Sequence, residues 1–195
     1  YRQELKKIRD VQTRLGSKST LRAWRTTAGG TDSGQVLVGL EYPDQASWAV
    51  DSTKAQADAE WMKIQAGLAD VRTVVSNAIW RDVSPVASKG AGGGTLLLTG
   101  IAVKPGKRDE YLKRVSAANA INDRLGMKNR IRVWQAEIAG QATGSMAVGV
   151  EYADLASYVG DQEKLAADAE WQKLLASLDE VRTVTGRWLY QEIAP

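Results

Sequence analysis

This sequence repeats itself. Sliding the chain along itself by about 110 residues aligns its two halves without a gap, and roughly a third of the aligned positions are identical. RLGSK at positions 14–18 matches RLGMK at 124–128, and VGLEYPD at Val38–Asp44 matches VGVEYAD at Val148–Asp154. Two copies of one pattern within 195 residues indicate a tandem duplication, so both halves are expected to adopt the same fold.

The second copy is the complete one, and its hydrophobic pattern predicts the order strand, helix, strand, strand, helix, strand. Its opening strand is an apolar, β-rich run that ends at Pro105-Gly106, and Gly126 ends the helix that follows. This order is that of the split βαβ, or ferredoxin-like, unit. The predicted elements are Thr95–Val103, Lys107–Leu125, Ile131–Ile138, Ser145–Tyr152, a long helix from Asp154 or Ser157 through Leu178, and Val184–Ile193.

The predicted fold class is therefore α+β, with two fused βαββαβ repeats. We place the first repeat at 1–85, a Gly-rich linker at 86–94 and the second repeat at 95–195. Tyr1 matches Tyr111, which lies in the predicted helix, so the first repeat lacks its opening strand. A sheet without that strand exposes an interior edge, which is unfavourable. We therefore expect a strand upstream of Tyr1 in the parent protein.

Two absent residue types limit the catalytic and metal-binding groups that the chain can offer. With no Cys, the chain has no thiolate nucleophile and no thiolate metal site. With no His, it lacks the usual general base, the commonest metal ligand and the usual proximal haem ligand. Any catalysis would rest on Arg, Lys, Tyr, Trp and carboxylates, and we predict neither a metal nor a cofactor.

Charge and hydropathy limit the classes of partner that the chain is expected to bind. The formal net charge of +3 comes from interspersed basic and acidic residues, so no nucleic-acid partner is expected. No apolar run approaches the ~20 residues of a membrane-spanning helix, so no membrane insertion is expected. The missing cysteines fit both reducing and oxidising surroundings, which leaves the compartment open, with the cytoplasm favoured over export.

The segment VKPGKRDEYL, the hairpin that follows it and the segment LAADAEWQKLLASL resemble the dimeric α/β-barrel superfamily. The resemblance covers essentially the whole chain, twice. It implies two ferredoxin-like units packed sheet against sheet, here as an intramolecular pseudo-dimer that could assemble further into a homo-oligomer. In that superfamily the pocket lies between the sheet and the helices or inside the barrel. The haem-dependent members rely on a histidine, which this chain lacks.

The resemblance implies a protein that handles a small molecule. One alternative is a cofactor-free monooxygenase, cyclase or isomerase, as in the antibiotic-biosynthesis monooxygenases. The other is a non-catalytic ligand-binding or structural protein of the NIPSNAP or stress-responsive type. The sequence leaves both open and does not name the substrate.

The hairpin of each repeat carries the first candidate site. A symmetric hairpin would place Arg22 opposite Glu41 and Trp24 opposite Gly39, because alternate residues of a strand share one face. A guanidinium, an indole and a carboxylate inside a barrel could bind and polarise an oxygen-rich substrate. The alternative is a cross-strand ion pair with a packing Trp. The second repeat carries the same set in Arg132, Trp134, Gly149 and Glu151.

Further candidates lie outside the hairpin. Arg72 and Arg182, in the repeated VRTV, could contact an anion at a pocket mouth or cap the carbonyls of the preceding helix. Trp61 and Trp171 are expected in the core. Tyr190 could serve as a weak acid, which favours the second repeat as the active one. The candidate catalytic residues are Arg132, Glu151 and Tyr190, and the candidate ligand-binding residues are Arg22, Trp24, Glu41, Arg132, Trp134, Glu151, Arg72 and Arg182.

Overall fold

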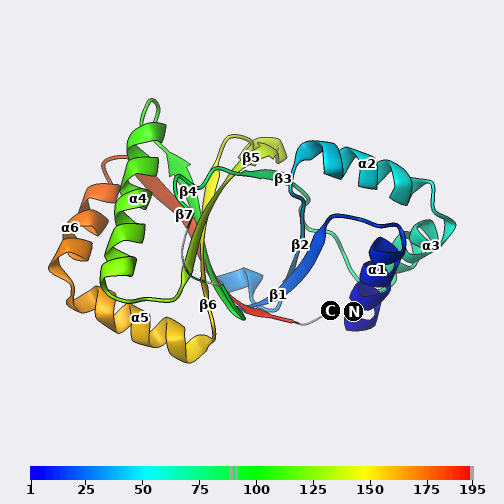
Figure 1. Ribbon diagram of the computed structural model, residues 1–195, viewed down its shortest axis with the longest axis horizontal. Coiled ribbons are helices and arrows are strands. Elements are labelled where there is room, and N and C mark those ends of the chain that lie inside the picture. Colours follow the sequence, from blue (N-terminus) through cyan, green and yellow to red (C-terminus); the bar gives the residue numbers. More distant parts are fainter. Residues whose placement is uncertain (88–89, 91, 194–195) are drawn as a thin grey trace. The chain divides into compact units, whose positions relative to one another are not determined.

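A computed structural model describes residues 1–87, 90 and 92–193 of the chain (Figure 1). The middle of the predicted linker and the end of the second repeat include residues 88–89, 91 and 194–195, which lie outside the described residues. The chain forms two compact units. The first comprises Tyr1–Arg25, Gln35–Ser76 and Glu192–Pro195, and the second comprises Thr26–Gly34 and Asn77–Gln191.

The first unit is built from three helices and two antiparallel strands. Its core lies between the first and third helices, where Ile8 and Val11 meet Ile64 and Leu68. These apolar residues recur at the spacing of one helix face, so their burial provides the free energy that holds the two helices together. The elements are α1 (Arg2–Arg14), β1 (Thr20–Ala28), β2 (Val36–Glu41), α2 (Gln45–Gln56) and α3 (Ala59–Leu68); the last residues of β1 belong to the second unit.

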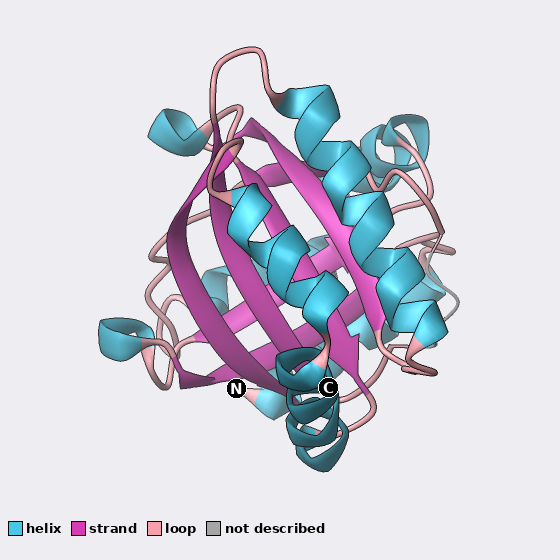
Figure 2. Ribbon diagram, turned by 90° about the vertical axis from the view of Figure 1, so that its left-hand side faces the viewer, coloured by secondary structure: helices cyan, strands magenta, loops and turns pink. Residues whose placement is uncertain are grey.

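The second unit holds a larger antiparallel sheet with helices packed on one face (Figure 2). Its hydrogen-bonded strand order is β7-β4-β6-β5-β3, of which the first four strands follow the ferredoxin-like order 4-1-3-2 of the second repeat. The elements are the 3₁₀ turns η1 (Gly30–Asp32) and η2 (Gly140–Ala142), the strands β3 (Ile79–Asp82), β4 (Thr95–Val103), β5 (Arg130–Ile138), β6 (Met146–Tyr152) and β7 (Arg182–Glu192), and the helices α4 (Arg108–Arg124), α5 (Leu155–Ala167) and α6 (Ala169–Leu178).

The core of the second unit explains why its helices lie on that face. Tyr111 and Val115 of α4 contact a cluster that also contains Ile131 and Val133 of β5 and Ile101 of β4. The strand residues of this cluster alternate along the chain, as the inward face of a half-buried strand requires. No helix in the described part of the chain is long and apolar enough to cross a membrane.

The single long helix predicted to run through Leu178 is wrong, because the structure contains two helices there, α5 and α6. Asp168 has an extended backbone, with φ −91° and ψ 116°, and its side chain accepts a hydrogen bond from the Trp171 amide at 2.8 Å. An aspartate in this geometry is an N-cap, which starts a new helix rather than continuing the old one. Asp58 does the same for α3 in the first unit.

Corresponding elements of the two halves start 110 residues apart: β1 and β5 at 20 and 130, α2 and α5 at 45 and 155, and α3 and α6 at 59 and 169. The compact units nevertheless divide the chain differently from the sequence repeats. β3 comes from the first sequence repeat, yet it lies in the second unit, where it pairs with β5. The repeat boundaries at 1–85 and 95–195 therefore stay a prediction about the sequence.

The predicted hairpin register is wrong by two residues. In β5 and β6, Arg132 lies opposite Gly149, and Glu151 lies opposite Arg130. The hairpin of the first unit has the same shift, with Arg22 opposite Gly39. Neither arginine therefore faces the glutamate that a symmetric hairpin would give it.

The connecting loop causes this shift. In the second unit the loop closes through a hydrogen bond from the Gly144 amide to the Ala136 carbonyl at 2.8 Å, after the short turn η2. Gly144 has φ +87°, a conformation that glycine adopts without steric cost. The midpoint between paired residues of the two strands is therefore closer to β5 than a symmetric loop would place it.

The predicted linker, which belongs to the second unit, packs closely against the rest of that unit at Gly90 and Gly93. A Cβ added at Gly90 would lie 1.9 Å from the Asn129 carbonyl oxygen, and one at Gly93 would lie 2.5 Å from the Ala153 Cα. Larger residues would clash with this backbone, so the composition of the linker is required by packing here as well as by flexibility.

Candidate functional site

Arg22 of the first unit forms an ion pair with a carboxylate that was not among the predicted site residues. Its guanidinium donates to both carboxylate oxygens of Glu192, from Nε at 3.0 Å and from Nη2 at 3.3 Å. The Arg22 Cζ also lies 4.5 Å from the centre of the Trp24 ring, and Trp24 is buried. The structure thus brings two of the predicted residues together and supplies a different acid.

The second unit contains the equivalent arrangement. Arg132 Nε donates to Asp82 Oδ2 at 2.9 Å, and Arg132 Cζ lies 4.8 Å from the centre of the Trp134 ring. Asp82 comes from β3, which pairs with β5 so that Asp82 lies opposite Trp134. Burial of the Asp82 carboxyl would raise its pKa, but the hydrogen bonds from Ser84 and Arg132 outweigh burial and hold the pKa below its usual range.

Sequence reasoning missed both acids, although a signal was present. Asp82 and Glu192 are 110 residues apart, so they occupy the same position in the two repeats, near the end of the last strand of each. The repeated carboxylate could have been found by aligning the halves. The arginine that pairs with each carboxylate could not have been found in this way, because the pairing depends on which strand lies beside β1 or β5.

Glu151, predicted to face Arg132, instead forms a buried ion pair with Arg130. Arg130 Nη2 donates to Glu151 Oε1 at 2.7 Å, and the Glu151 side chain is 2 % exposed. The approach of Gly92 helps to enclose the pair, because a Cβ there would lie 2.7 Å from Glu151 Oε2. The pair therefore lies in an enclosed position, and the catalytic role predicted for Glu151 stays a prediction.

Arg182 is a buried arginine without a carboxylate partner. It is 9 % exposed, and in the described part of the chain no carboxylate lies within ion-pair distance of it. Its Cζ lies 5.9 Å from the centre of the ring of Tyr111, which is fully buried. Among the described residues, neither Arg182 Nε nor Tyr111 Oη has a hydrogen-bonding partner. Burial raises the pKa of Tyr111 to about 12, against the opposing effect of the Arg182 charge.

The same pair recurs in the first unit. Arg72 Nη1 donates to the Tyr1 hydroxyl at 3.3 Å, and these residues are the counterparts of Arg182 and Tyr111. A tyrosine at the start of a helix and an arginine after the last helix of the repeat therefore meet in both halves. The roles predicted for these arginines, contact with an anion or capping of helix carbonyls, stay predictions.

The remaining aromatic candidates are held mainly by packing. Trp61 and Trp171 are partly buried and pack against the helix cores of their units, as expected for core residues. Tyr190 is 8 % exposed and lies opposite Leu96 in the sheet. Burial raises the pKa of Tyr190, against a hydrogen bond with Thr26 that lowers it, so its hydroxyl stays protonated at neutral pH.

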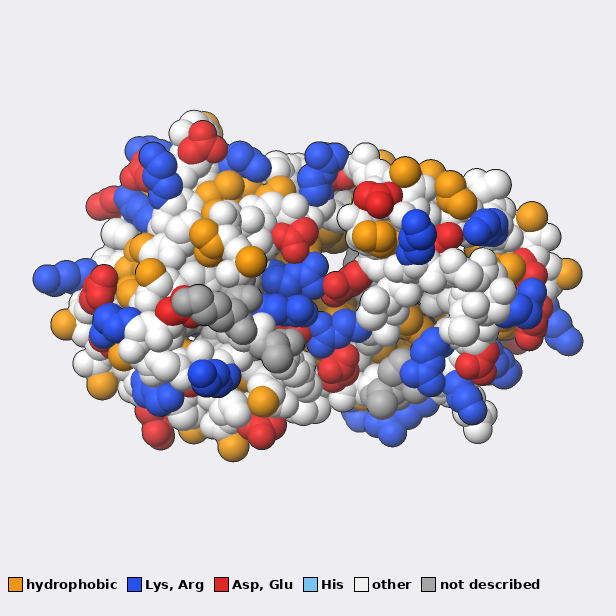
Figure 3. All heavy atoms as spheres, viewed as in Figure 1, with side chains coloured by type: hydrophobic (Ala, Val, Ile, Leu, Met, Phe, Trp, Pro, Cys, Tyr) orange, Lys and Arg blue, Asp and Glu red, His pale blue; other side chains and the backbone are white. Residues whose placement is uncertain are grey.

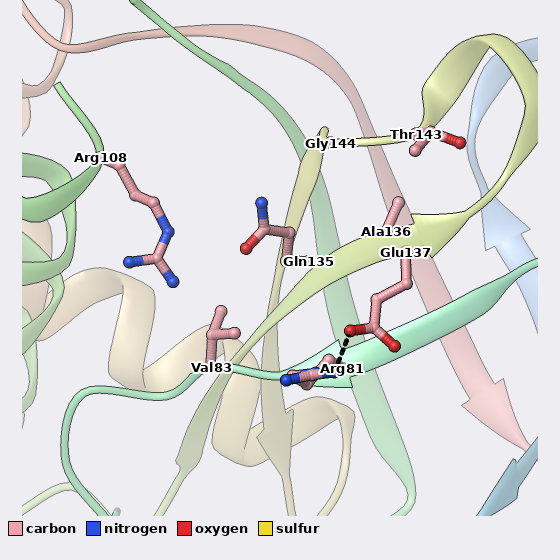
Figure 4. A pocket seen from close by; sticks show the side chains of 8 residues that line it. All are labelled: Arg81, Val83, Arg108, Gln135, Ala136, Glu137, Thr143 and Gly144. Carbon is pink, nitrogen blue, oxygen red and sulfur yellow. Dashed lines mark ion pairs between the residues drawn. The ribbon is translucent and has the colours of Figure 1, made fainter. Parts of the chain in front are cut away.

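A pocket of about 440 Å³ opens on the second unit, at the edge where β3 joins β5 (Figure 4). Arg108 reaches it from the first turn of α4, and Gln135 and Glu137 reach it from β5. Glu137 forms an ion pair with Arg81 of β3, at 2.5 Å. Val83, Ala136, Thr143 and Gly144 complete the lining.

None of the residues predicted from sequence lines this pocket. Gln135 and Glu137 alternate with Trp134 and Ala136 along β5, so they lie on the opposite face of the strand from Trp134. Their face is the one that carries Val133 into the core under α4. The sequence offered a signal in this alternation of polar residues, but only the addition of β3 to the sheet edge forms a pocket there.

The chemistry of the pocket follows from its polar groups. The guanidinium of Arg108 and the amide of Gln135 point toward each other, and the carboxylate of Glu137, which also lines the pocket, points toward Arg81 (Figure 4). A cation and an amide donor can bind an oxyanion, and a carboxylate within the same space can accept a proton. Val83 provides an apolar wall, since it also packs against the helix core of the unit.

Solved structures share this fold. The chain is similar to a proposed monooxygenase from Lactobacillus acidophilus, with a TM-score of 0.61 and 10 % identity over 99 % of this chain and 85 % of that one. It is also similar to an anthrone oxidase-like protein, with a TM-score of 0.60 and 13 % identity over 98 % of this chain and 86 % of that one. A proposed monooxygenase from Fusobacterium nucleatum gives a TM-score of 0.61 and 11 % identity over 96 % and 83 %. No family model and no curated protein matches the chain.

Proposed function

We propose that this protein is a cofactor-free monooxygenase of the dimeric α/β-barrel type, built as two fused ferredoxin-like repeats, and that its substrate binds in the pocket of the second unit. The observation that carries the proposal is that Arg108, Gln135 and Glu137 line one open pocket of about 440 Å³. That volume lies within the range of small-molecule sites. Support for the reaction class comes from the fold shared with the proposed monooxygenases and the anthrone oxidase-like protein.

The reaction would use the acidity of the substrate itself. A planar ketone with an activated CH₂ group, such as anthrone, loses a proton to form an enolate. Glu137 would accept this proton, while Arg108 and Gln135 stabilise the oxyanion. The enolate carbon then reacts with O₂, and the CH₂ group becomes C=O while the second oxygen atom leaves as water. Molecular oxygen is thus the only co-reactant.

The alternative is a non-catalytic ligand-binding or structural protein. It is favoured by the ion pairs at the residues first predicted as the site. Arg22 and Arg132 each have a carboxylate partner, and Glu151 is enclosed with Arg130. Such satisfied cross-strand pairs are what a purely structural role requires.

Two measurements test the proposal: binding of anthrone by titration calorimetry, and oxygen consumption with anthrone as substrate. We expect the wild type to bind and to consume oxygen. Glu137→Gln should bind anthrone but lose turnover, because the amide accepts no proton, and Arg108→Gln should weaken binding. Exposed residues of the same unit supply matched controls, Glu163→Gln and Lys113→Gln, which should behave as wild type.

Binding without oxygen consumption in the wild type would favour the non-catalytic alternative. Turnover that survives in Glu137→Gln would exclude this carboxylate as the base. If neither anthrone nor its enolate binds, the pocket is not the site of such a reaction.

A further inference from the structure

The outer edge of β2 in the first unit is incompletely covered. Among the described strands, β2 stands at the end of the hydrogen-bonded order, with β1 as its neighbour. Three of its apolar side chains are substantially exposed: Val36 at 38 %, Leu37 at 37 % and Leu40 at 39 %. A strand edge that carries exposed apolar residues is a template for pairing with another strand.

The second unit shows what covers the equivalent strand. β6 corresponds to β2 at an offset of 110 residues, and β6 is paired with β5 on one side and with β4 on the other. Its counterparts of Val36 and Leu37 are Met146 at 2 % and Ala147 at 7 % exposure. The difference between the two strands is therefore the presence of β4.

The contribution of β4 extends into the helix core. Ile101 of β4 is fully buried within the cluster that joins α4 and α6 to the sheet, and it lies opposite Met146. The core cluster of the first unit has no strand residue in this position among its buried members, which all come from α1 and α3. Hydrophobic side chains are also visible over α2 on the surface of this unit (Figure 3).

We propose that the β2 edge is a docking site for an extended apolar segment, which pairs with it antiparallel as β4 pairs with β6. The register follows from that pairing. Leu97, Thr99 and Ile101 of β4 lie opposite Val150, Val148 and Met146. An equivalent segment on β2 places its corresponding residues opposite Leu40, Val38 and Val36. Main-chain hydrogen bonds supply affinity, and the alternate apolar side chains supply specificity. This inference is independent of the proposed function, because the pocket lies in the second unit.

The occupant follows from chemistry on both faces of β2. The face toward the helices needs apolar residues at alternate positions, as Leu97 and Ile101 provide to β6. The opposite face needs small residues or leucines, as Leu96 and Gly100 provide. A segment with charged residues at these positions would bury charge against Leu40 and Val36, which costs free energy.

The test uses a fluorescent peptide with the sequence of Thr95–Val103, flanked by lysines for solubility, and the full chain. Saturable binding measured by anisotropy is expected, together with slower hydrogen exchange of the amides at positions 36–41. The control peptide carries proline in place of Leu97 and of Ile101, which removes main-chain donors and should abolish binding.

A matched pair of variants of the chain locates the site. Leu40→Lys should weaken peptide binding at least tenfold, whereas Leu175→Lys, in α6, should leave it unchanged, because Leu175 has a similar exposure of 37 % but is not part of the β2 edge. Circular dichroism checks that both variants fold.

Three outcomes would overturn the proposal. The first is an absence of saturable binding. The second is an equal effect of both lysine variants, or protection at β6 in place of β2, which would mean that the peptide displaces β4. The third is concentration-dependent self-association that Leu40→Lys abolishes while the peptide fails to bind, which would assign the edge to a second copy of the chain.

Discussion

The buried pair of Arg130 and Glu151 allows a quantitative test of the corrected register. The pair joins atoms 2.7 Å apart, and the Glu151 side chain is 2 % exposed while that of Arg130 is 30 % exposed. Replacing Arg130 by Met leaves the carboxylate buried without its cation. Removal of one partner of a buried ion pair costs about 3–5 kcal/mol, and we expect the lower end of about 3 kcal/mol, since water reaches the arginine side.

Arg132→Met is the matched comparison. It removes an arginine from the same strand two residues away, but its partner Asp82 has a side chain 42 % exposed. Because water can solvate the remaining carboxylate, we expect a loss of about 1 kcal/mol or less. The double variant Arg130→Met/Glu151→Leu removes both buried charges and should lie within about 1 kcal/mol of the wild type.

The free energy of unfolding is measured by urea denaturation followed by tryptophan fluorescence, with hydrogen exchange of the β6 amides to report on the second unit alone. The order of the free energies of unfolding of the three variants decides the test. If Arg132→Met destabilises the protein as much as Arg130→Met does, or if the double variant is no more stable than Arg130→Met, then Glu151 is not the buried partner of Arg130.

Three further predictions test packing and titration. Gly149→Ala should lower the free energy of unfolding by about 1–3 kcal/mol, since its Cβ would lie 2.5 Å from Trp134 Cζ3, while Gly39→Ala, at 3.5 Å from Trp24 Cζ3, should be nearly neutral; equal urea midpoints would contradict this. Folding raises the pKa of Tyr111 to about 12, so its contribution to the free energy of unfolding is complete below pH ~10 and is lost as the pH rises toward 12. Tyr111→Phe should therefore make the free energy of unfolding less dependent on pH in that window. Folding lowers the pKa of Asp82, so its contribution to the free energy of unfolding is present above pH ~4 and is lost as the pH falls through the folded pKa. Asp82→Asn should therefore reduce the slope of the free energy of unfolding against pH on the acid side. An unchanged slope would show that the pairing of Asp82 with Arg132 does not stabilise the fold.

Much of the local structure could be predicted from the repeat and the hydrophobic pattern. The strand predicted at Thr95–Val103 is β4 with the same bounds, and the hairpin strands and the first helix agree within a few residues. These elements follow from short-range preferences of the backbone and from the alternation of apolar residues, which the sequence displays directly. The break at Asp168 was missed, although aspartate before an Ala-Glu-Trp segment is an N-cap signal.

The partners of the charged residues could not be predicted in the same way. Arg132 was assigned to Glu151 on the assumption of a symmetric loop, and a shift of two residues gave that glutamate to Arg130. A shift by an even number keeps every side chain on its face, so the hydrophobic pattern cannot detect it. The asymmetric turn at Gly144 determines the register, through a loop whose conformation the alternation of residues does not encode.

The sequence by itself determined that one α+β pattern occurs twice and that neither thiol nor imidazole chemistry is present, because both are properties of residue order and type. Only the tertiary structure decided that β3 adds to β5, which gives Arg132 its carboxylate and forms the pocket of Arg108, Gln135 and Glu137. The physical reason is that strand pairing between distant segments is chosen by the packing of whole faces and by backbone hydrogen bonds. Neither leaves a periodic signal in the residues that pair.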